Sequence, residues 1–206
     1  PTIGGDLIGS RPINLHIHAL QKLGARIEYR DMKKEGAYLA QAHNGLKGAT
    51  ISLDYPSVGA TENTILAAVR AKGTTLIKNA AIEPEIIDLI LFLQKLGVNI
   101  MVDVDRTISI QQTHHFEEVE HTVLADRNEV ASYAMAAVST KGRVFIEGAE
   151  HLHMIAFLNK LREIGGNFQI RPNGIEFFYT NELKGGLHLE TDVHPGFMTD
   201  WQQPFV

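Results

Sequence analysis

Cysteine is absent from the 206 residues, so the chain can form no disulfide and offers no thiolate ligand to a metal. This composition fits a cytosolic protein, and we expect a cytoplasmic location. The chain also has no apolar run of the roughly 20 residues that a membrane span requires. Its first residues are rich in glycine rather than basic and then apolar, as a leader would be. We therefore expect no membrane partner.

Clusters of lysine and arginine are also missing. The formal net charge is −5 at pH 7, and without a basic patch the chain has no electrostatic footprint for a polyanion. We expect no nucleic acid partner. The first residue is Pro1 rather than Met, and the sequence stops at Val206 inside an apolar opening. We therefore expect a fragment of a longer protein; the oligomeric state is left open.

Ten histidines are present, and six of them form close pairs. The pairs are His16 with His18, His114 with His115, and His151 with His153. Helical metal ligands usually stand at i and i+4, and no carboxylate triad or His-Glu-x-x-His run accompanies these pairs. We predict no metal site. The acidic run at residues 117–120 is predicted to be a solvated loop or edge strand.

An internal repeat organises the chain. The motif Leu-x-x-Leu/Ile-Gly occurs at residues 20–24, 93–97 and 161–165. Each copy closes a predicted helix with apolar residues at helical spacing, and its glycine takes the position just after the helix end. Strands are predicted after each copy, at residues 25–29, 98–102 and 167–170, each followed by a turn and another strand.

Two alanine-rich helices are predicted at residues 61–71 and 129–140, and each runs into a predicted strand, at residues 73–77 and 142–146. The repeating unit is therefore a βαβαββ-like module, too long for the common solenoids. Alternating strands and helices predict an α/β fold with helices buried by sheets. Alanine favours helix and permits close packing.

Helix starts are candidate anion sites, because the first turn exposes free N–H groups and a partial positive charge. Ser57 can cap the first alanine-rich helix, and Gly59 lets a diphosphate reach the backbone. At the matching place in the next unit, Asp126 and Glu129 form a capping-box-like pair, which we interpret as structural. Asp200 lies at a further helix opening, where local pattern alone favours an N-cap.

Asp6 lies in the stretch Gly-Gly-Asp-Leu-Ile-Gly-Ser-Arg-Pro, residues 4–12. Glycine tolerates positive φ and close approach of a ligand, and Arg11 follows five residues later. A mobile acid beside a fixed cation suits proton transfer to an anionic substrate. Gly, Asp and Ser are also ordinary turn formers, so a surface turn remains the alternative.

Taken together, the motifs resemble the UDP-N-acetylglucosamine 1-carboxyvinyltransferases, a family of enolpyruvyl transferases, over the whole chain. The matching stretches are Gly-Ser-Arg-Pro-Ile-Asn-Leu-His (9–16), Leu-Lys-Gly-Ala (46–49), Ser-Val-Gly-Ala-Thr-Glu-Asn (57–63), Asn-Ala-Ala-Ile-Glu-Pro-Glu-Ile-Ile-Asp (79–88), Ala-Asp-Arg-Asn-Glu (125–129) and His-Pro-Gly-Phe-Met-Thr-Asp (194–200). The resemblance implies the enolpyruvyl transferase fold, an inside-out α/β barrel of repeated βαβαββ units with buried helices. It implies two repeat units of one globular domain in residues 1–122. Residues 123–206 then hold one unit, and the start of another, of a second domain.

By this resemblance the enolpyruvyl group of phosphoenolpyruvate passes to the 3-hydroxyl of UDP-N-acetylglucosamine, with release of phosphate and without metal or organic cofactor. Asp6 matches the loop acid, which is usually Cys in the family, and Asp200 matches the general base for the sugar hydroxyl. The implied substrate-binding residues are Arg11, Pro12, Ile13, Asn14, Leu15, His16, Tyr55, Pro56, Ser57, Val58, Gly59 and Thr199.

The chain departs from the family at two further positions. Tyr55 replaces a common Lys before the diphosphate segment, and Ile82 replaces an expected Arg; both changes remove a cation and bear on nucleotide affinity. A Lys-Asn pair and several substrate arginines of the family lie outside these residues, so this polypeptide alone should not turn over. Two alternatives are a shikimate 3-phosphate enolpyruvyl transferase, whose Ser-Lys-Ser opening is not seen, and a non-catalytic nucleotide-sugar-binding homologue.

Overall fold

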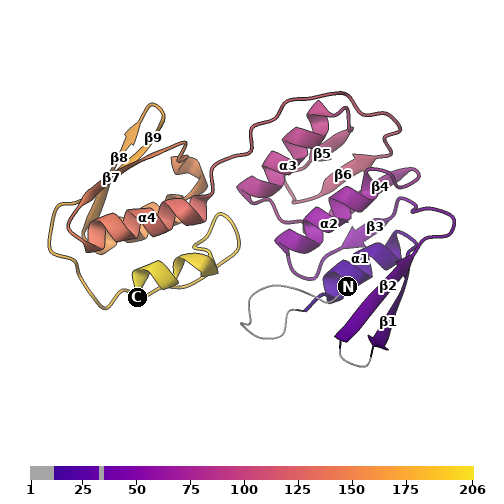
Figure 1. The fold of residues 1–206 in the computed structure, drawn as a ribbon, viewed down its shortest axis with the longest axis horizontal. Coiled ribbons are helices and arrows are strands. Elements are labelled where there is room, and N and C mark those ends of the chain that lie inside the picture. Colours follow the sequence, from indigo (N-terminus) through magenta and orange to yellow (C-terminus); the bar gives the residue numbers. More distant parts are fainter. Residues whose placement is uncertain (1–11, 33–34) are drawn as a thin grey trace. The chain divides into compact units, whose positions relative to one another are not determined.

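The computed structural model describes residues 12–32 and 35–206 (Figure 1). The chain divides between His121 and Thr122 into two compact units. No helix in the described part of the chain is both long and apolar enough to cross a membrane.

In the first unit, the residues that the structure describes form three helices and two sheets. The helices are α1 (Asn14–Lys22), α2 (Val58–Ala68) and α3 (Pro84–Lys95). The strands are β1 (Arg26–Met32), β2 (Glu35–Gln41), β3 (Thr50–Ser52), β4 (Thr74–Lys78), β5 (Ile100–Val102) and β6 (Ile108–Gln111). Strands β1 and β2 pair as an antiparallel hairpin, and the other four form a sheet in the order β3-β4-β6-β5. Only β3 and β4 in that sheet are parallel.

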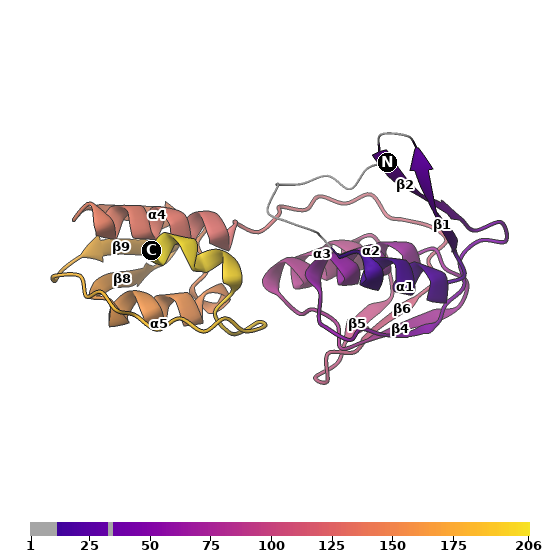
Figure 2. The ribbon, with the colours of Figure 1, turned by 90° about the horizontal axis from the view of Figure 1, so that it is seen from below.

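The core of the first unit lies between this sheet and the helices, which Figure 2 shows side by side along one side of β4, β5 and β6. Alternate residues of the strands, such as Ile77, Ile108 and Ile110, are fully buried against the helices. Ala60 and Ile65 of α2 are equally buried. Small side chains on α2 let it pack closely, and this places its first turn beside α1.

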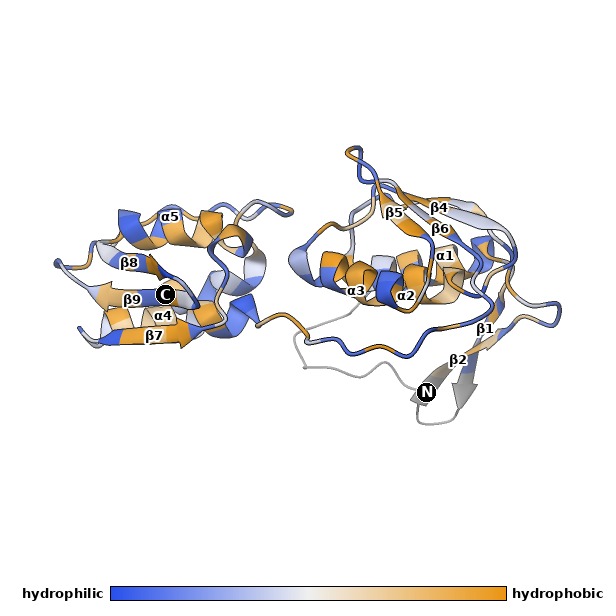
Figure 3. Cartoon of the chain, turned by 90° about the horizontal axis from the view of Figure 1, so that it is seen from above, coloured by the Kyte–Doolittle hydropathy of each residue, from blue (hydrophilic) through white to orange (hydrophobic). Residues whose placement is uncertain are grey.

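The second unit repeats this arrangement with helices α4 (Arg127–Ser139) and α5 (Ile155–Glu163) and strands β7 (Arg143–Glu147), β8 (Gly166–Arg171) and β9 (Gly174–Tyr179). It also has three short 3₁₀ turns, η1 (His151–His153), η2 (Thr199–Trp201) and η3 (Gln203–Phe205). The strand order β7-β9-β8 is that of β4-β6-β5, and all pairs are antiparallel. Figure 3 shows that the strands of the four-stranded sheet and of the β7-β9-β8 sheet mix apolar and polar residues, because one face of each of these sheets is buried.

The predicted repeat is confirmed. Helices α1, α3 and α5 each end two residues before a glycine with positive φ, at Gly24 (95°), Gly97 (88°) and Gly165 (96°). An antiparallel strand pair follows each of them. The order β3-α2-β4-α3-β5-β6 is one full βαβαββ unit.

Both alanine-rich helices begin earlier than predicted, at Val58 rather than residue 61 and at Arg127 rather than residue 129. Capping side chains set these starts. The Asp126 carboxylate accepts from the N–H of Asn128 at 2.7 Å, so the structural role predicted for Asp126 is confirmed.

The acidic run at residues 117–120 lies in a segment without helix or strand, as predicted, that leads from β6 to α4. This segment is tied to the first unit at several points. Arg70 donates to the carbonyl of His114 at 2.8 Å. His121 Nε2 lies 3.1 Å from a carboxylate oxygen of Asp88 on α3, and its ring packs on Phe92. The segment is therefore anchored as far as His121, the last residue of the first unit.

Candidate functional site

The predicted site residues fall in three places along the chain. Asp6 and Arg11 lie outside the described residues. The segments 12–16 and 55–59 belong to the first unit, and Thr199 and Asp200 belong to the second. The first unit brings its two segments together, because α1 packs on the first half of α2.

His16 joins α1 to α2. Its Nδ1 lies 2.6 Å from the side-chain amide nitrogen of Asn63. A Cβ on Gly59 would stand only 3.3 Å from Cε1 of the same ring. Gly59 therefore gives the imidazole room to lie against the first turn of α2. The rest of the α1 segment starts the helix, with Ile13 at the N-cap position and without a side-chain cap.

The protonation state of His16 follows from this contact. With the amide nitrogen of Asn63 facing the ring, Nδ1 acts as the acceptor, so the proton of the neutral ring sits on Nε2. Burial lowers the pKa of His16 from its ordinary value, because the charged form loses hydration. Both effects favour a neutral imidazole that presents an N–H donor.

The start of α2 has the form of an anion site. Ser57 is extended, with φ −73° and ψ 124°, and its hydroxyl accepts from the N–H of Ala60 at 3.3 Å, which confirms the predicted cap. The N–H groups of Val58 and Gly59 precede the first intrahelical bond and lie at the positive end of the helix dipole. Tyr55, which stands where the resembled family commonly has a Lys, is 59% exposed. The positive character here thus comes from the backbone.

The loop that carries Ile82 is held against α2. Thr61 accepts from the N–H of Ala81 at 3.0 Å, and Asn79, with φ 53°, donates from its amide to the carbonyl of Leu53 at 2.8 Å. Both bonds span more than one element, so they fix the loop beside β3 and α2. Ile82 itself is half-buried.

Glu62 and Asn63 are residues that the sequence analysis gave no role. The pKa of Glu62 is raised, first by burial and then by the charge of Glu85 on α3. Asn63 stands four residues after Gly59, on the same face of the helix. That spacing is the signal that could have identified it as a neighbour of His16.

In the second unit, Asp200 is exposed in the middle of η2. The expectation from local pattern, that Asp200 is an N-cap, is wrong, because Met198 takes that position and no side chain caps the turn. The predicted helix opening is also two 3₁₀ turns rather than one helix. Pro204 lacks the N–H that would bond back to Asp200, and it falls in the first turn of η3.

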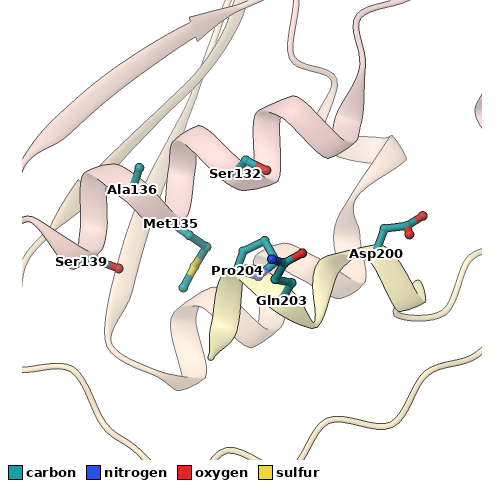
Figure 4. A pocket seen from close by; sticks show the side chains of 7 residues that line it. All are labelled: Ser132, Met135, Ala136, Ser139, Asp200, Gln203 and Pro204. Carbon is teal, nitrogen blue, oxygen red and sulfur yellow. The ribbon is translucent and has the colours of Figure 1, made fainter. Parts of the chain in front are cut away.

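Asp200 lines an open hollow of about 460 Å³ between α4 and the two 3₁₀ turns (Figure 4). The lining residues are Ser132, Met135, Ala136, Ser139, Asp200, Gln203 and Pro204. Figure 4 shows Asp200 at one end of this hollow, on the opposite side from α4. Its carboxylate is thus accessible to a ligand.

Across the described part of the chain, no group of three or more His, Asp or Glu side chains is placed to hold a metal ion. Two of the histidines considered for metals have other contacts. His16 bonds to Asn63, and His151 Nδ1 lies 2.9 Å from Glu150.

Comparisons with known proteins identify relatives over the whole chain. A sequence profile of the family described as EPSP synthase (3-phosphoshikimate 1-carboxyvinyltransferase) matches residues 3–206. A UDP-N-acetylglucosamine 1-carboxyvinyltransferase of Protochlamydia amoebophila is 72% identical over 206 residues, which are 100% of this chain and 44% of that protein. A protein of the same name from Chlamydia trachomatis serovar D is 60% identical over 206 residues, covering 100% of this chain and 46% of its own.

Among solved structures, the crystal structure of the enolpyruvyl transferase NikO from Streptomyces tendae matches with a TM-score of 0.77 and 19% identity. The match covers 95% of this chain and 48% of that one, and at this identity it shows the fold alone. The predicted fold class is thereby confirmed. The chain spans less than half the length of each of these two relatives.

Proposed function

The chain belongs to the EPSP synthase (3-phosphoshikimate 1-carboxyvinyltransferase) family, and on this premise we propose that the full-length protein is an enolpyruvyl transferase. It transfers the enolpyruvyl group of phosphoenolpyruvate to the 3-hydroxyl of UDP-N-acetylglucosamine and releases phosphate, the first committed step of peptidoglycan precursor synthesis. The observation that carries this proposal is the 72% identity to a relative named for that reaction. No cofactor is required.

The nucleotide-sugar is held by the first unit. Residues 12–15 bind on the uridine side, and His16 supplies a neutral N–H donor there. Arg11 binds phosphoenolpyruvate and the nucleotide. The free N–H groups at the start of α2 receive the diphosphate, and Ser57 keeps that first turn in shape. This proposal is supported by the contacts of His16 on α1 with Gly59 and Asn63 on α2.

Transfer needs one acid and one base. Asp6 protonates the vinyl carbon of phosphoenolpyruvate, which makes the neighbouring carbon electrophilic. Asp200 takes the proton of the sugar 3-hydroxyl while the hydroxyl oxygen bonds to that electrophilic carbon. The Asp6 carboxylate then takes a proton back from the new methyl group of the adduct while the C–O bond to phosphate breaks, which restores the enol double bond and releases phosphate. The exposure of Asp200 supports its role.

Two departures shape the expected affinity. Tyr55 is exposed next to the diphosphate site and brings no charge, so the diphosphate depends on helix N–H groups and on arginines elsewhere in the protein. Ile82 is half-buried in the loop against α2. We expect weaker nucleotide binding than with Lys and Arg at these positions. The enzyme works in the cytoplasm.

A second candidate follows from the name of the matching family: an acceptor of the shikimate 3-phosphate type. Calorimetric titration of the full-length protein separates the two. Heat with UDP-N-acetylglucosamine supports the proposal; heat only with shikimate 3-phosphate transfers the assignment to the second candidate. Binding of the UDP-sugar without any phosphate release would indicate a non-catalytic sensor.

A further inference from the structure

We propose that Arg127 is a positioning residue for Asp200, and that it acts by holding the ring of Trp201. The inference rests on the proposed function, because it treats Asp200 as the general base. It adds Arg127 and Trp201, to which no role in the reaction has been given, and it concerns the second unit alone.

Trp201 is the anchor of η2. It is the last residue of this turn and is 1% exposed. Its ring centroid lies 5.7 Å from that of Phe157 on α5 and 5.5 Å from that of Phe197, both in edge-to-face geometry. Its ring nitrogen makes no hydrogen bond to any residue that the structure describes. Contacts to the faces and edges of the ring, rather than a hydrogen bond of the indole nitrogen, therefore hold Trp201.

Arg127 of α4 packs on the ring of Trp201. It is the first residue of the helix and is 6% exposed. Its guanidinium carbon lies 5.5 Å from the centroid of the Trp201 ring, a cation–π distance. One of its nitrogens, Nη1, donates to the carbonyl of His153 at 3.4 Å. A buried arginine thus links the start of α4, the end of η1 and the turn that carries Asp200.

The geometry of the turn transmits this anchoring to Asp200. A 3₁₀ turn has three residues per turn, so neighbouring side chains point about 120° apart. With Trp201 buried beneath Arg127, Asp200 is directed outward, and it is exposed at the end of the hollow beside α4 (Figure 4). A turn that loses the anchor of its ring can rotate, and a carboxylate that misses the reacting hydroxyl by about 1 Å loses about a hundredfold in rate.

The test is a double-mutant cycle in the full-length protein, read as phosphate release from phosphoenolpyruvate and UDP-N-acetylglucosamine. Arg127→Met keeps the side-chain length and removes the cation. We expect kcat to fall at least about tenfold while KM for the UDP-sugar stays within about twofold, because the residues proposed to bind the uridine and the diphosphate belong to the first unit. In an Asp200→Asn background, the same change should alter kcat by less than about twofold, because the group that it positions no longer accepts a proton.

Three further variants control the interpretation. Trp201→Phe keeps a ring under the guanidinium and should retain most activity, whereas Trp201→Leu should reproduce Arg127→Met. Arg162→Met removes a matched cation–π pair of the same unit, in which the guanidinium carbon lies 4.1 Å from the Phe168 ring centroid. This variant should leave kcat and KM unchanged. If Arg127→Met fails to fold by circular dichroism, Arg127→Gln, which also removes the cation, replaces it with the same expected dependence on Asp200.

The outcomes separate the two claims. Wild-type protein without phosphate release overturns both the proposed function and this inference. An active wild type whose kcat is unaffected by Arg127→Met overturns the inference alone. An equal fall in kcat in both backgrounds does so as well, because it shows a structural loss independent of Asp200.

Discussion

The side-chain amide of Asn63 on α2 lies 2.6 Å from Nδ1 of His16 on α1, and this contact ties together the two segments proposed to hold the nucleotide-sugar. A protonated ring would present N–H at Nδ1 and lose this bond. Burial of the ring also favours the neutral form and lowers the pKa of His16.

Stability should therefore depend on pH through His16. Its pKa in the folded protein is below that in the unfolded chain, so the unfolded state takes up the proton first as pH falls. The contribution of His16 is complete above the unfolded value of about 6.5 and is lost as pH falls through the lowered value. Urea unfolding of the full-length protein at pH 7.5 and pH 5 should show a smaller difference for His16→Gln than for wild type.

The matched control for that experiment is His18→Gln, because His18 is exposed on the same helix. It should keep the wild-type difference between the two pH values. Equal pH dependence in wild type and His16→Gln would show that the contact with Asn63 does not govern the protonation of the ring.

Substitutions at Ser57 should separate the cap from the anion site. Ser57→Ala removes the acceptor for the N–H of Ala60 and should lower the free energy of unfolding by about 1 kcal/mol. Ser57→Asp is also a good cap and should keep that stability, yet its charge repels a diphosphate at the same N–H groups. Calorimetry should show much weaker binding of the UDP-sugar to Ser57→Asp. Unchanged binding would remove the diphosphate from this helix start.

Asp6 should act as the general acid of the loop, at a position outside the described residues. Asp6→Asn keeps the volume but cannot donate an acidic proton, so turnover should fall by about 10²-fold or more while affinity for the UDP-sugar is nearly kept. Epoxide drugs that alkylate the family's Cys should not inactivate the wild type, because a carboxylate is a far poorer nucleophile than a thiolate. Asp6→Cys should keep activity and gain drug sensitivity. Near-normal turnover of Asp6→Asn would reduce the residue to a turn former.

Much of the fold could be predicted because its signals are local. The helix–glycine–strand motif depends on apolar spacing and one positive φ, and all three copies form as expected. The alanine pattern alone starts the two alanine-rich helices two or three residues late, whereas the caps predicted from the sequence, Ser57 and Asp126, mark where the helices begin. Pro204 divides the last predicted helix into two turns for the equally local reason that it lacks an N–H.

The side-chain pairs of the candidate site could not be predicted in the same way. His16 and Asn63 are 47 positions apart in the sequence. Arg127 and Trp201 lie near opposite ends of the second unit's sequence, and they come into contact only in the folded chain. Such contacts depend on how elements far apart in the sequence pack together. Spacing within one helix can show which residues share a face, as for Gly59 and Asn63, but not which side chain of another element they meet.

Phosphate release by the full-length protein from phosphoenolpyruvate, compared between two acceptors, tests the central claim most directly. With UDP-N-acetylglucosamine, release should be catalytic and should be abolished by the combined Asp6→Asn and Asp200→Asn substitutions. With shikimate 3-phosphate, it should stay at the level seen without acceptor. Catalytic release with shikimate 3-phosphate, or no release with the UDP-sugar, would contradict the account.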